Sequence, residues 1–434
     1  MKDINALKYL EELRRLGSNY GLERTERLLE LLGNPHKKLK LIHIAGTNGK
    51  GSTSAIVGKI LIEHGYKVGF FNSPHLEEIE ETIRVNDDNI PEDDLVSLLE
   101  EVSPYVNKVV EEGYKHPTEF EVLTCIMFLY LYRKKVDFGI IEVGLGGRLD
   151  STNVITPILS IITSISLDHT NLLGNTIEEI TREKAGIIKD NIPVVTCYQK
   201  SEAIEIIKEK ALLTKSNLSV VGSNNYKLLE IINSDVPYQR VSINLDSNNY
   251  ILDLYLLGRH QITNLSLAIK SLEKLEELNF IKFNYDNLYS GVKKVRWKGR
   301  LEVLRKNPLL VIDGAHNIAG IEFLKNNIEE YFSYKNIYLI LGILADKNVE
   351  EMVSIITPMA NEVYTVTANS SRAKSANELK DVVLKYNKNC IAFDQYKKAI
   401  DLALSKAKKD DLIIASGSLY MIGELRKLLV NNLI

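Results

Sequence analysis

A glycine-rich turn carries the residues with the clearest chemistry in this sequence. An apolar run over residues 39–45 leads into Gly46-Thr47-Asn48-Gly49-Lys50-Gly51-Ser52, and a helical pattern follows over 52–64. A strand, a turn and a helix in this order form a phosphate cradle, because the turn N–H groups reach phosphate oxygens and the lysine adds positive charge. We therefore predict a nucleotide-binding loop at 46–52. A tight turn without a ligand is the alternative, but it needs neither the lysine nor the hydroxyls.

The match to the phosphate-loop pattern G-x-x-x-x-G-K-[ST] is incomplete. Ile44 stands at the first glycine position, and Gly51 stands where a magnesium-binding hydroxyl is usual. Ser52 is therefore predicted to supply that hydroxyl, with Thr53 as the fallback.

Two strand-like runs downstream end in groups that can bind metal or phosphate. Glu142 ends the run at 136–143, a usual position for a carboxylate that holds Mg²⁺ directly or through water. Asp168 and His169 end the run at 157–166. They can serve a second metal or a phosphate, or Asp168 can simply cap a helix. Because open α/β sheets place their sites at strand ends, these groups are expected beside the cradle.

Two further segments have glycine-rich turns. Residues 144–149 read G-x-G-x-x-L and open no helical pattern, so they are a weak dinucleotide fingerprint. Asp313, His316 and Asn317 share one turn after the run at 309–313. Three such side chains in one loosened turn favour a functional role over a plain cap.

The elements that must position these residues fall into two parts. The first 35 residues predict two helices. Later strands are predicted at 67–71, 136–143, 157–166 and 193–196, and later helices at 91–110, 118–133, 176–189, 262–278 and 285–293. Three β-type runs between 226 and 257 are separated by Asn, Asp, Ser and Pro, which predicts antiparallel strands at a sheet edge.

From residue 309 the pattern becomes regular. Strands at 309–313, 336–342, 362–367, 390–394 and 411–415 alternate with helical patterns. This alternation predicts an α/β fold with a doubly wound, mostly parallel sheet. The joint is expected near 296–300, which divides the chain into domains 1–295 and 296–434.

Composition narrows the class of protein. The 434 residues suffice for two or three domains, and 45% apolar with 26% charged residues is typical of a globular protein. A net charge of -3 without a basic stretch argues against nucleic acid as the main partner. Three distant cysteines fit reduced thiols in a cytoplasmic protein. The first residues do not read as a signal peptide, and the longest apolar stretch is too short and polar for a membrane span.

Eight motifs occur in one order along the chain. They are GTNGKGS, SPHL, EVGLGGRLDSTNV, DHTNLLG with EKAGIIK, GRHQITN, RWKGRLE, IDGAHN and GSLYMIGEL. Together they resemble the folylpolyglutamate synthase and dihydrofolate synthase family of the Mur ligase superfamily, over about residues 20–424. The resemblance implies an N-terminal P-loop ATPase domain, with a mostly parallel sheet and a small antiparallel sheet. It also implies a C-terminal Rossmann-like domain and an active site in the cleft between the two.

The family chemistry that this resemblance implies is an ATP-dependent ligation. L-glutamate is joined to the carboxylate of a reduced folate or of dihydropteroate. ATP first converts the carboxylate into an acyl phosphate, which the amino group of glutamate attacks, while Mg²⁺ and cationic side chains stabilise the negative charge. The expected partners are therefore small molecules, and the expected protein is a monomer.

The resemblance also implies roles for individual residues. The phosphates would lie on Gly46, Thr47, Asn48, Gly49, Lys50, Gly51 and Ser52, with one Mg²⁺ on Ser52 and Glu142. A second Mg²⁺ would lie on His169 and on Lys184, the latter as a carbamate. His260 and Asn264 would meet the adenine, Arg300 the γ-phosphate, and Asp313 the ribose or phosphates. Ser73 and His75 would contact the substrate, Asp150 its pterin ring, and His316 and Ser418 would border the glutamate site.

Three positions depart from the family pattern. Thr82 replaces an arginine that usually follows Glu81, and Arg84 can substitute for it. Ile318 and Lys298 each replace a proline, which affects loop stiffness more than chemistry.

Two other functions stay open. A cell-wall Mur ligase shares the cradle and the acyl phosphate but normally has an additional N-terminal domain for a UDP-sugar. A nucleotide-dependent switch without ligase activity would leave Glu142, Asp168, His169 and Asp313 unexplained.

Overall fold

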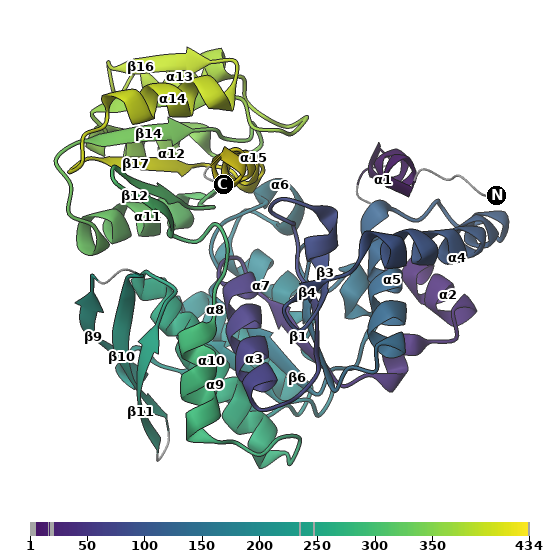
Figure 1. Ribbon diagram of the computed structural model, residues 1–434. Coiled ribbons are helices and arrows are strands. Elements are labelled where there is room, and N and C mark those ends of the chain that lie inside the picture. Colours follow the sequence, from purple (N-terminus) through teal and green to yellow (C-terminus); the bar gives the residue numbers. More distant parts are fainter. Residues whose placement is uncertain (1–5, 16, 18–20, 234–235, 246–247, 433–434) are drawn as a thin grey trace.

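The computed structural model describes residues 6–15, 17, 21–233, 236–245 and 248–432. The chain forms two lobes (Figure 1). The larger N-lobe contains an eight-stranded sheet and a separate three-stranded sheet, and the C-lobe contains a six-stranded sheet. The predicted α/β class, with a mostly parallel sheet in each lobe, is confirmed.

The eight-stranded sheet has the order β4-β3-β2-β5-β1-β6-β7-β8. Its strands are β1 (Leu41–Ala45), β2 (Val68–Phe71), β3 (Ile83–Val85), β4 (Asp88–Asn89), β5 (Phe138–Glu142), β6 (Leu159–Ile162), β7 (Val194–Cys197) and β8 (Leu218–Val221). β1 pairs in parallel with β5 on one side and β6 on the other. Because parallel strands end at the same edge, the cradle after β1 lies beside Glu142 and the loop after β6.

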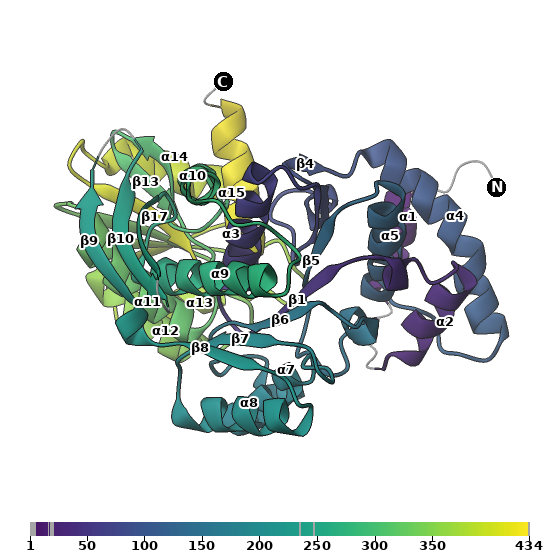
Figure 2. The same cartoon turned by 90° about the horizontal axis from the view of Figure 1, so that it is seen from below.

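The N-lobe has helices on both faces of this sheet, and further helices that pack on those. They are α1 (Ala6–Arg15), α2 (Glu23–Leu31), α3 (Lys50–Glu63), α4 (Glu92–Glu111), α5 (Glu119–Arg133), α6 (Thr170–Leu173), α7 (Ile177–Ala185), α8 (Ser201–Leu213), α9 (Arg259–Glu277) and α10 (Tyr285–Lys294). Figure 2 shows α3 and α9 on one side of β1 and β5, with α4 and α5 on the other.

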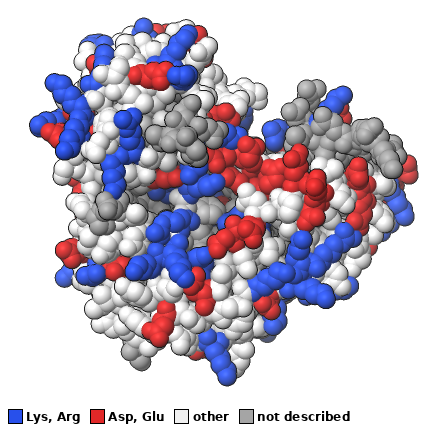
Figure 3. All heavy atoms as spheres, in the orientation of Figure 1, with Lys and Arg blue, Asp and Glu red and all other residues white. Residues whose placement is uncertain are grey.

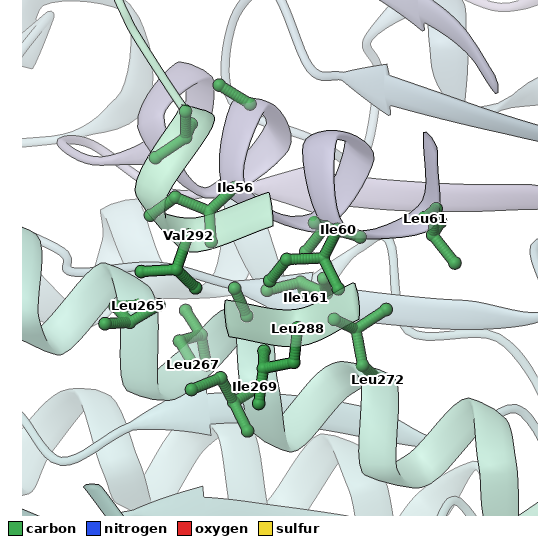
Figure 4. Close-up of a cluster of buried hydrophobic side chains, with 14 of the residues drawn as sticks. Ile56, Ile60, Leu61, Ile161, Leu265, Leu267, Ile269, Leu272, Leu288 and Val292 are labelled. Atoms are coloured by element: carbon green, nitrogen blue, oxygen red, sulfur yellow. The ribbon is translucent and has the colours of Figure 1, made fainter. Parts of the chain in front are cut away.

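The helix that follows the cradle is buried in the core. Ile56 and Ile60 of α3 pack with Leu265 of α9 and with Leu288 and Val292 of α10 (Figure 4). This apolar packing stabilises the helix and therefore holds its N-terminus rigidly beneath the cradle.

The three-stranded sheet corrects one prediction. β9 (Tyr226–Ile232), β10 (Tyr238–Leu245) and β11 (Asn248–Leu254) are antiparallel as expected. They do not extend the edge of the large sheet, because β8 occupies that edge and these strands pack on α9 and α10 instead. The sequence interpretation also left α8 and β8 unassigned.

The C-lobe sheet has the order β12-β13-β17-β14-β15-β16. Its strands are β12 (Glu302–Lys306), β13 (Leu309–Ile312), β14 (Ile337–Leu341), β15 (Glu362–Val366), β16 (Cys390–Phe393) and β17 (Leu412–Ser416). Its α-helices are α11 (Ile318–Tyr331), α12 (Val349–Ile356), α13 (Ala376–Val383), α14 (Tyr396–Lys406) and α15 (Leu419–Asn432). All predicted strands are present. β12 is additional: it is an antiparallel edge strand whose charged, partly exposed residues hide the strand pattern.

The two lobes contact each other through the SPHL segment. Leu76 of the N-lobe packs against the core of the C-lobe, and the next residue, Glu77, accepts a 2.7 Å hydrogen bond from Arg426 of α15. Lys298 lies 3.1 Å from both Glu77 and Glu81. Acidic side chains gather near the middle of the face in Figure 3, beside the hollow between the lobes.

None of the helices in the described ranges is both long enough and apolar enough to cross a bilayer.

Candidate active site

A cavity of about 590 Å³ lies between the lobes. Most of the predicted site residues line it: Gly46, Thr47, Asn48, Gly49, Lys50, Gly51, Ser52, Ser73, His75, Glu142, His169, Lys184, His260, Arg300, Asp313 and His316. Residues from the ends of β1, β5 and β13 thus share one space, although more than 250 positions separate the first from the last by the numbering of the chain.

The cradle loop is fixed before any phosphate arrives. Gly49 caps α3 with φ = 92°, a conformation that favours glycine. The Lys50 Nζ donates to the carbonyl oxygens of Gly46 and Thr47 at 3.2 and 3.3 Å. The lysine is therefore curled over its own loop, where its charge adds to the positive end of α3.

The structure explains why glycine replaces a hydroxyl residue at position 51. A Cβ on Gly51 would lie 2.7 Å from Cζ2 of Trp297, so no side chain fits there. Trp297 belongs to the joint between the lobes, and the joint therefore packs directly on the phosphate loop.

Ser52 and Glu142 offer oxygen atoms suited to Mg²⁺. The Ser52 hydroxyl accepts from Gln261 Nε2 at 3.2 Å, and Glu142 Oε1 lies 3.9 Å from Lys50 Nζ. Both line the cavity. In the described part of the chain, no group of three or more His, Cys, Asp and Glu side chains converges on a metal position. Two protein oxygens nevertheless fit Mg²⁺ at a nucleotide, because this ion keeps waters and takes phosphate oxygens as its other ligands.

Lys184 lies at the far wall of the cradle. It is buried, and its Nζ donates to the Gly46 carbonyl oxygen at 3.0 Å. Burial, together with the charge of Lys50, lowers the pKa of Lys184 to about 7. About half of the amine is therefore in its neutral form near neutral pH, which is not the case for an exposed lysine.

Asp168 links the lobes instead of capping a helix. Its carboxylate accepts from Lys347 Nζ at 2.5 Å and from Asn317 Nδ2 at 3.0 Å, both from the C-lobe. His316 Nε2 lies 3.8 Å away. Burial raises the pKa of Asp168, but Lys347 with His169 and His316 outweighs burial and holds this pKa well below its usual range. The carboxylate thus stays ionised.

The loop that carries Asp168 begins earlier than predicted. β6 ends at Ile162, so the strand does not reach residue 166. The next residues leave the sheet because the Ser164 carbonyl oxygen accepts from the N–H groups of Thr47 and Asn48. The loop after β6 therefore supports the cradle.

Asp313 fixes the turn that presents Arg300. Its two oxygens accept from the N–H groups of Leu301 and Ala315 at 2.9 and 2.8 Å. Leu301 has φ = 43°, an unfavourable value for a leucine, and the bond from Asp313 helps to hold it. The Arg300 guanidinium lies against Gly314 and faces the cavity.

Two histidines that line the cavity, His260 and His316, are in neutral form. Burial lowers the pKa of both His260 and His316 to about 4. His316 Nδ1 donates to the Gly314 carbonyl oxygen at 2.8 Å, which leaves Nε2 unprotonated. His260 lies near the ring of Phe323 and contacts Asn327, so the C-lobe completes the pocket next to α9.

Two family models match the chain. The Mur ligase middle domain matches residues 44–272, and the Mur ligase glutamate ligase domain matches residues 299–419. A dihydrofolate synthase/folylpolyglutamate synthase of Bacillus subtilis is 36% identical over 417 residues, covering 95% of this chain and 96% of the relative.

The chain belongs to the folylpolyglutamate synthase and dihydrofolate synthase family.

Solved structures agree with this assignment. The folylpolyglutamate synthase of Thermotoga maritima is 35% identical, with a TM-score of 0.85, and the match covers 98% of this chain and 97% of that one. The Mycobacterium tuberculosis folylpolyglutamate synthase, complexed with ADP and AMPPCP, is 27% identical, with a TM-score of 0.88 and coverage of 98% and 99%. The family and the fold predicted from the eight motifs are therefore confirmed.

Three residues to which the family resemblance gave ligand contacts do not line the cavity. Asn264 lies behind the cradle, where a Cβ on Gly49 would come within 2.4 Å of its Oδ1. Ser418 is buried, and its hydroxyl has no partner among the described residues. Both are close to the site without facing it.

Asp150 makes several hydrogen bonds within its own loop. One carboxylate oxygen accepts from Leu145 N–H, and the other accepts from the N–H and the hydroxyl of Thr152. Contact of this carboxylate with a pterin ring stays a prediction. The hydrogen bond from Leu145 N–H also ties Asp150 to the turn at 144–147, which follows Glu142.

Several residues that line the cavity of this protein were not identified from the sequence as site residues. They include Asn72, Gln261, Phe323 and Asn327. Lys347, which contacts the cavity residue Asp168, was not picked out either. None lies in a turn rich in glycine and polar groups except Asn72, which immediately precedes the SPHL motif.

Proposed function

We propose that this protein is an ATP-dependent ligase that adds L-glutamate to folates, and also to dihydropteroate, through an acyl phosphate. Its relative in Bacillus subtilis carries both names, and the Mycobacterium tuberculosis structure holds ADP and an ATP analogue. The observation that carries the proposal is one cavity shared by the cradle, Glu142 and the C-lobe groups Arg300 and His316.

The cradle and its neighbours would bind and activate the nucleotide. Lys50, released from the Gly46 and Thr47 carbonyl oxygens, would contact the β- and γ-phosphates. Ser52 and Glu142 would hold Mg²⁺, which neutralises charge on the phosphoryl group as it moves. Arg300 would approach the γ-phosphate from the C-lobe. This arrangement stabilises the negative charge that develops on the transferred phosphoryl group, and no covalent bond between the protein and the substrate is needed.

Lys184 and His169 would form a second metal position. As an amine, Lys184 cannot bind Mg²⁺, and it donates to the Gly46 carbonyl oxygen. Its neutral nitrogen can add to CO₂ and lose a proton, which gives a carbamate with two anionic oxygens. Burial and a pKa of about 7 favour this reaction. Carbamylation of Lys184 is thus part of the proposal.

His316 would border the incoming glutamate. Its unprotonated Nε2 faces Asp168 across 3.8 Å, close to the place where the lobes meet. A neutral imidazole at this point can accept the proton that the amino group of glutamate loses as it attacks the acyl phosphate.

The deciding experiment is ADP release with ATP, Mg²⁺ and L-glutamate. Tetrahydrofolate and dihydropteroate should each stimulate release, and a UDP-muramyl peptide should not. Stimulation by the muramyl peptide alone would favour a cell-wall ligase. Release that no carboxylate stimulates would favour a nucleotide switch. The predictions of a monomeric, cytoplasmic enzyme belong to the same proposal, and sedimentation tests the first of them.

A further inference from the structure

Arg84 is placed at the cavity wall between two aromatic rings. It lies on β3, directly opposite Phe70 of β2. The guanidinium carbon is 4.5 Å from the centroid of the Phe70 ring and 5.4 Å from that of Trp297. Contact with two aromatic rings limits the orientations that the guanidinium can take. Among the described residues no carboxylate pairs with Arg84, so its donors serve other groups.

One of those donors fixes the side-chain amide of Asn72. Arg84 Nη2 donates to Asn72 Oδ1 at 3.1 Å. Because arginine has donors only, the oxygen of the amide must face it, and the Nδ2 group must face the opposite way. The opposite side holds Ser54 Oγ at 3.1 Å and Glu142 Oε2 at 2.9 Å. The orientation of a buried amide thus depends on one guanidinium.

Asn72 in turn orients Glu142, the carboxylate that the proposed function assigns to Mg²⁺. The carboxylate is buried, and Asn72 holds Oε2 while Oε1 lies 3.9 Å from Lys50 Nζ. If the Asn72 amide turned over, its oxygen would face the carboxylate and repel it. A ligating carboxylate held in this way is pre-oriented for the metal.

The backbone around Asn72 explains why position 82 tolerates a threonine. Asn72 N–H donates to the Thr82 carbonyl oxygen at 3.0 Å, so residue 82 contacts Asn72 through its main chain. The guanidinium in this region comes from Arg84, two residues further along the chain on β3.

We infer that Arg84 is a positioning residue for the metal site: by holding the amide of Asn72, it sets the orientation of the Glu142 carboxylate toward Mg²⁺. This inference rests on the proposed function. The alternative is that Arg84, which also lines the cavity, contacts the pterin substrate directly.

Three variants separate these roles. Arg84→Met keeps an apolar stem between the two rings but removes the donor, and Arg84→Lys keeps a charge and a donor without the planar shape. Arg240→Met is the matched control, because Arg240 is a partly exposed arginine on β10 that pairs with Asp253 away from the cavity. Thermal unfolding of each variant shows whether the protein still folds.

The first measurement needs no turnover. AMPPCP binding is titrated by calorimetry in Mg²⁺ and in EDTA. In Mg²⁺, Arg84→Met should bind the analogue roughly 10–100-fold more weakly than the wild type, the usual effect of removing an outer-shell partner. In EDTA the two should bind equally. Arg84→Lys should recover part of the loss, and Arg240→Met should match the wild type.

The second measurement is ligation. Arg84→Met should lower kcat and raise the Mg²⁺ concentration needed for half-maximal rate, with the KM for tetrahydrofolate unchanged. Wild-type affinity for Mg²⁺·AMPPCP in a folded Arg84→Met would overturn the inference, and so would a raised KM for tetrahydrofolate alone. Failure of the wild type to ligate would count against the proposed function, whereas the binding titration still tests Arg84 by itself.

Discussion

Lys50 is the residue on which nucleotide activation depends most directly. It provides the only side-chain charge from the cradle loop itself, and its ammonium already lies over the Gly46 and Thr47 carbonyl oxygens. Lys50→Ala should lower the turnover of ligation at least about a hundredfold, as expected when one electrostatic stabiliser is removed. ADP release measures this. Near-normal turnover would refute the assignment of the cradle.

Lys184 gives a prediction about pH and CO₂. Its pKa of about 7 lies below the ordinary 10.5, so the folded protein releases this proton at lower pH than the unfolded chain. Between these values the unfolded chain binds more protons, and Lys184 by itself makes the free energy of unfolding rise with pH. Carbamate formation needs the neutral amine. After CO₂ depletion, bicarbonate should therefore restore ligation more fully at pH 8 than at pH 6.

A variant checks that this recovery belongs to Lys184. Lys184→Ala should nearly abolish ligation, and bicarbonate should not restore it. Short carboxylic acids in millimolar excess should restore part of the activity by replacing the carbamate. Full activity in Lys184→Ala would rule out a role for the modified side chain.

Asp150 distinguishes a positioning residue from a ligand contact. In Asp150→Asn an N–H₂ group would face the N–H of Leu145 or of Thr152, and a buried donor without an acceptor costs about 1–3 kcal/mol. The melting temperature should fall. The kcat of ligation should fall by a similar factor with tetrahydrofolate and with dihydropteroate as the substrate that receives glutamate. If only the KM for dihydropteroate rises, the result would instead support a direct contact between Asp150 and the pterin ring. Asp93→Asn, on the exposed face of α4, is the control.

At the scale of elements, the distinctive feature of this fold is that the joint between the lobes, at 296–300, packs on the phosphate loop. Trp297 contacts Gly51 at the first turn of α3, a helix otherwise held by α9 and α10. The nucleotide loop and the connection between the lobes therefore cannot move independently. This contact also accounts for the glycine at a position where related phosphate loops have a hydroxyl.

Gly51→Ala tests this packing. Alanine should favour the helix by roughly 1 kcal/mol, but its Cβ would lie 2.7 Å from the Trp297 ring, and overpacking typically costs about 1–3 kcal/mol. We expect a lower melting temperature and a raised KM for ATP. The double variant Gly51→Ala with Trp297→Leu should recover the affinity for ATP, since leucine leaves room for the methyl group. No recovery would mean that the strain lies elsewhere.

At the scale of the whole molecule, Asp168 and Lys347 tie the lobes together. Both side chains are more than 90% buried, and they contact each other beside Asn317 and His316. Removal of one member of a buried pair leaves an uncompensated charge, which typically costs about 3–5 kcal/mol. The relative position of the lobes, and so the shape of the cavity, depends on this contact.

Lys347→Met should open the lobes. The radius of gyration from small-angle scattering should increase, and kcat should fall more than the affinity for ATP, because the cradle lies entirely in the N-lobe. Lys335→Met removes an exposed pair with Asp410 within the C-lobe and should leave both measurements unchanged. An unchanged radius of gyration in Lys347→Met would show that the SPHL segment and α15 hold the lobes without this pair.

The sequence by itself determined the phosphate loop, the alternating strands and helices of the C-lobe, and the family. These features depend on local rules: glycines next to a lysine, apolar periods of two or 3.6 residues, and motifs in a fixed order. It did not reveal β12 or β8, whose partly exposed residues weaken the strand pattern.

Only the tertiary structure decided which polar groups face the cavity. The motif around Asp150 did not show that neighbouring N–H groups donate to both of its oxygens, and Lys347 gave no local signal yet contacts Asp168 at the cavity. Arg84 was noted only as a replacement for the arginine missing at position 82, and the structure places it at the cavity wall. The physical reason is that a side chain's role depends on which partners approach it. Asp168 and Lys347 are 179 positions apart in the sequence, so only the packing of the two lobes brings them together.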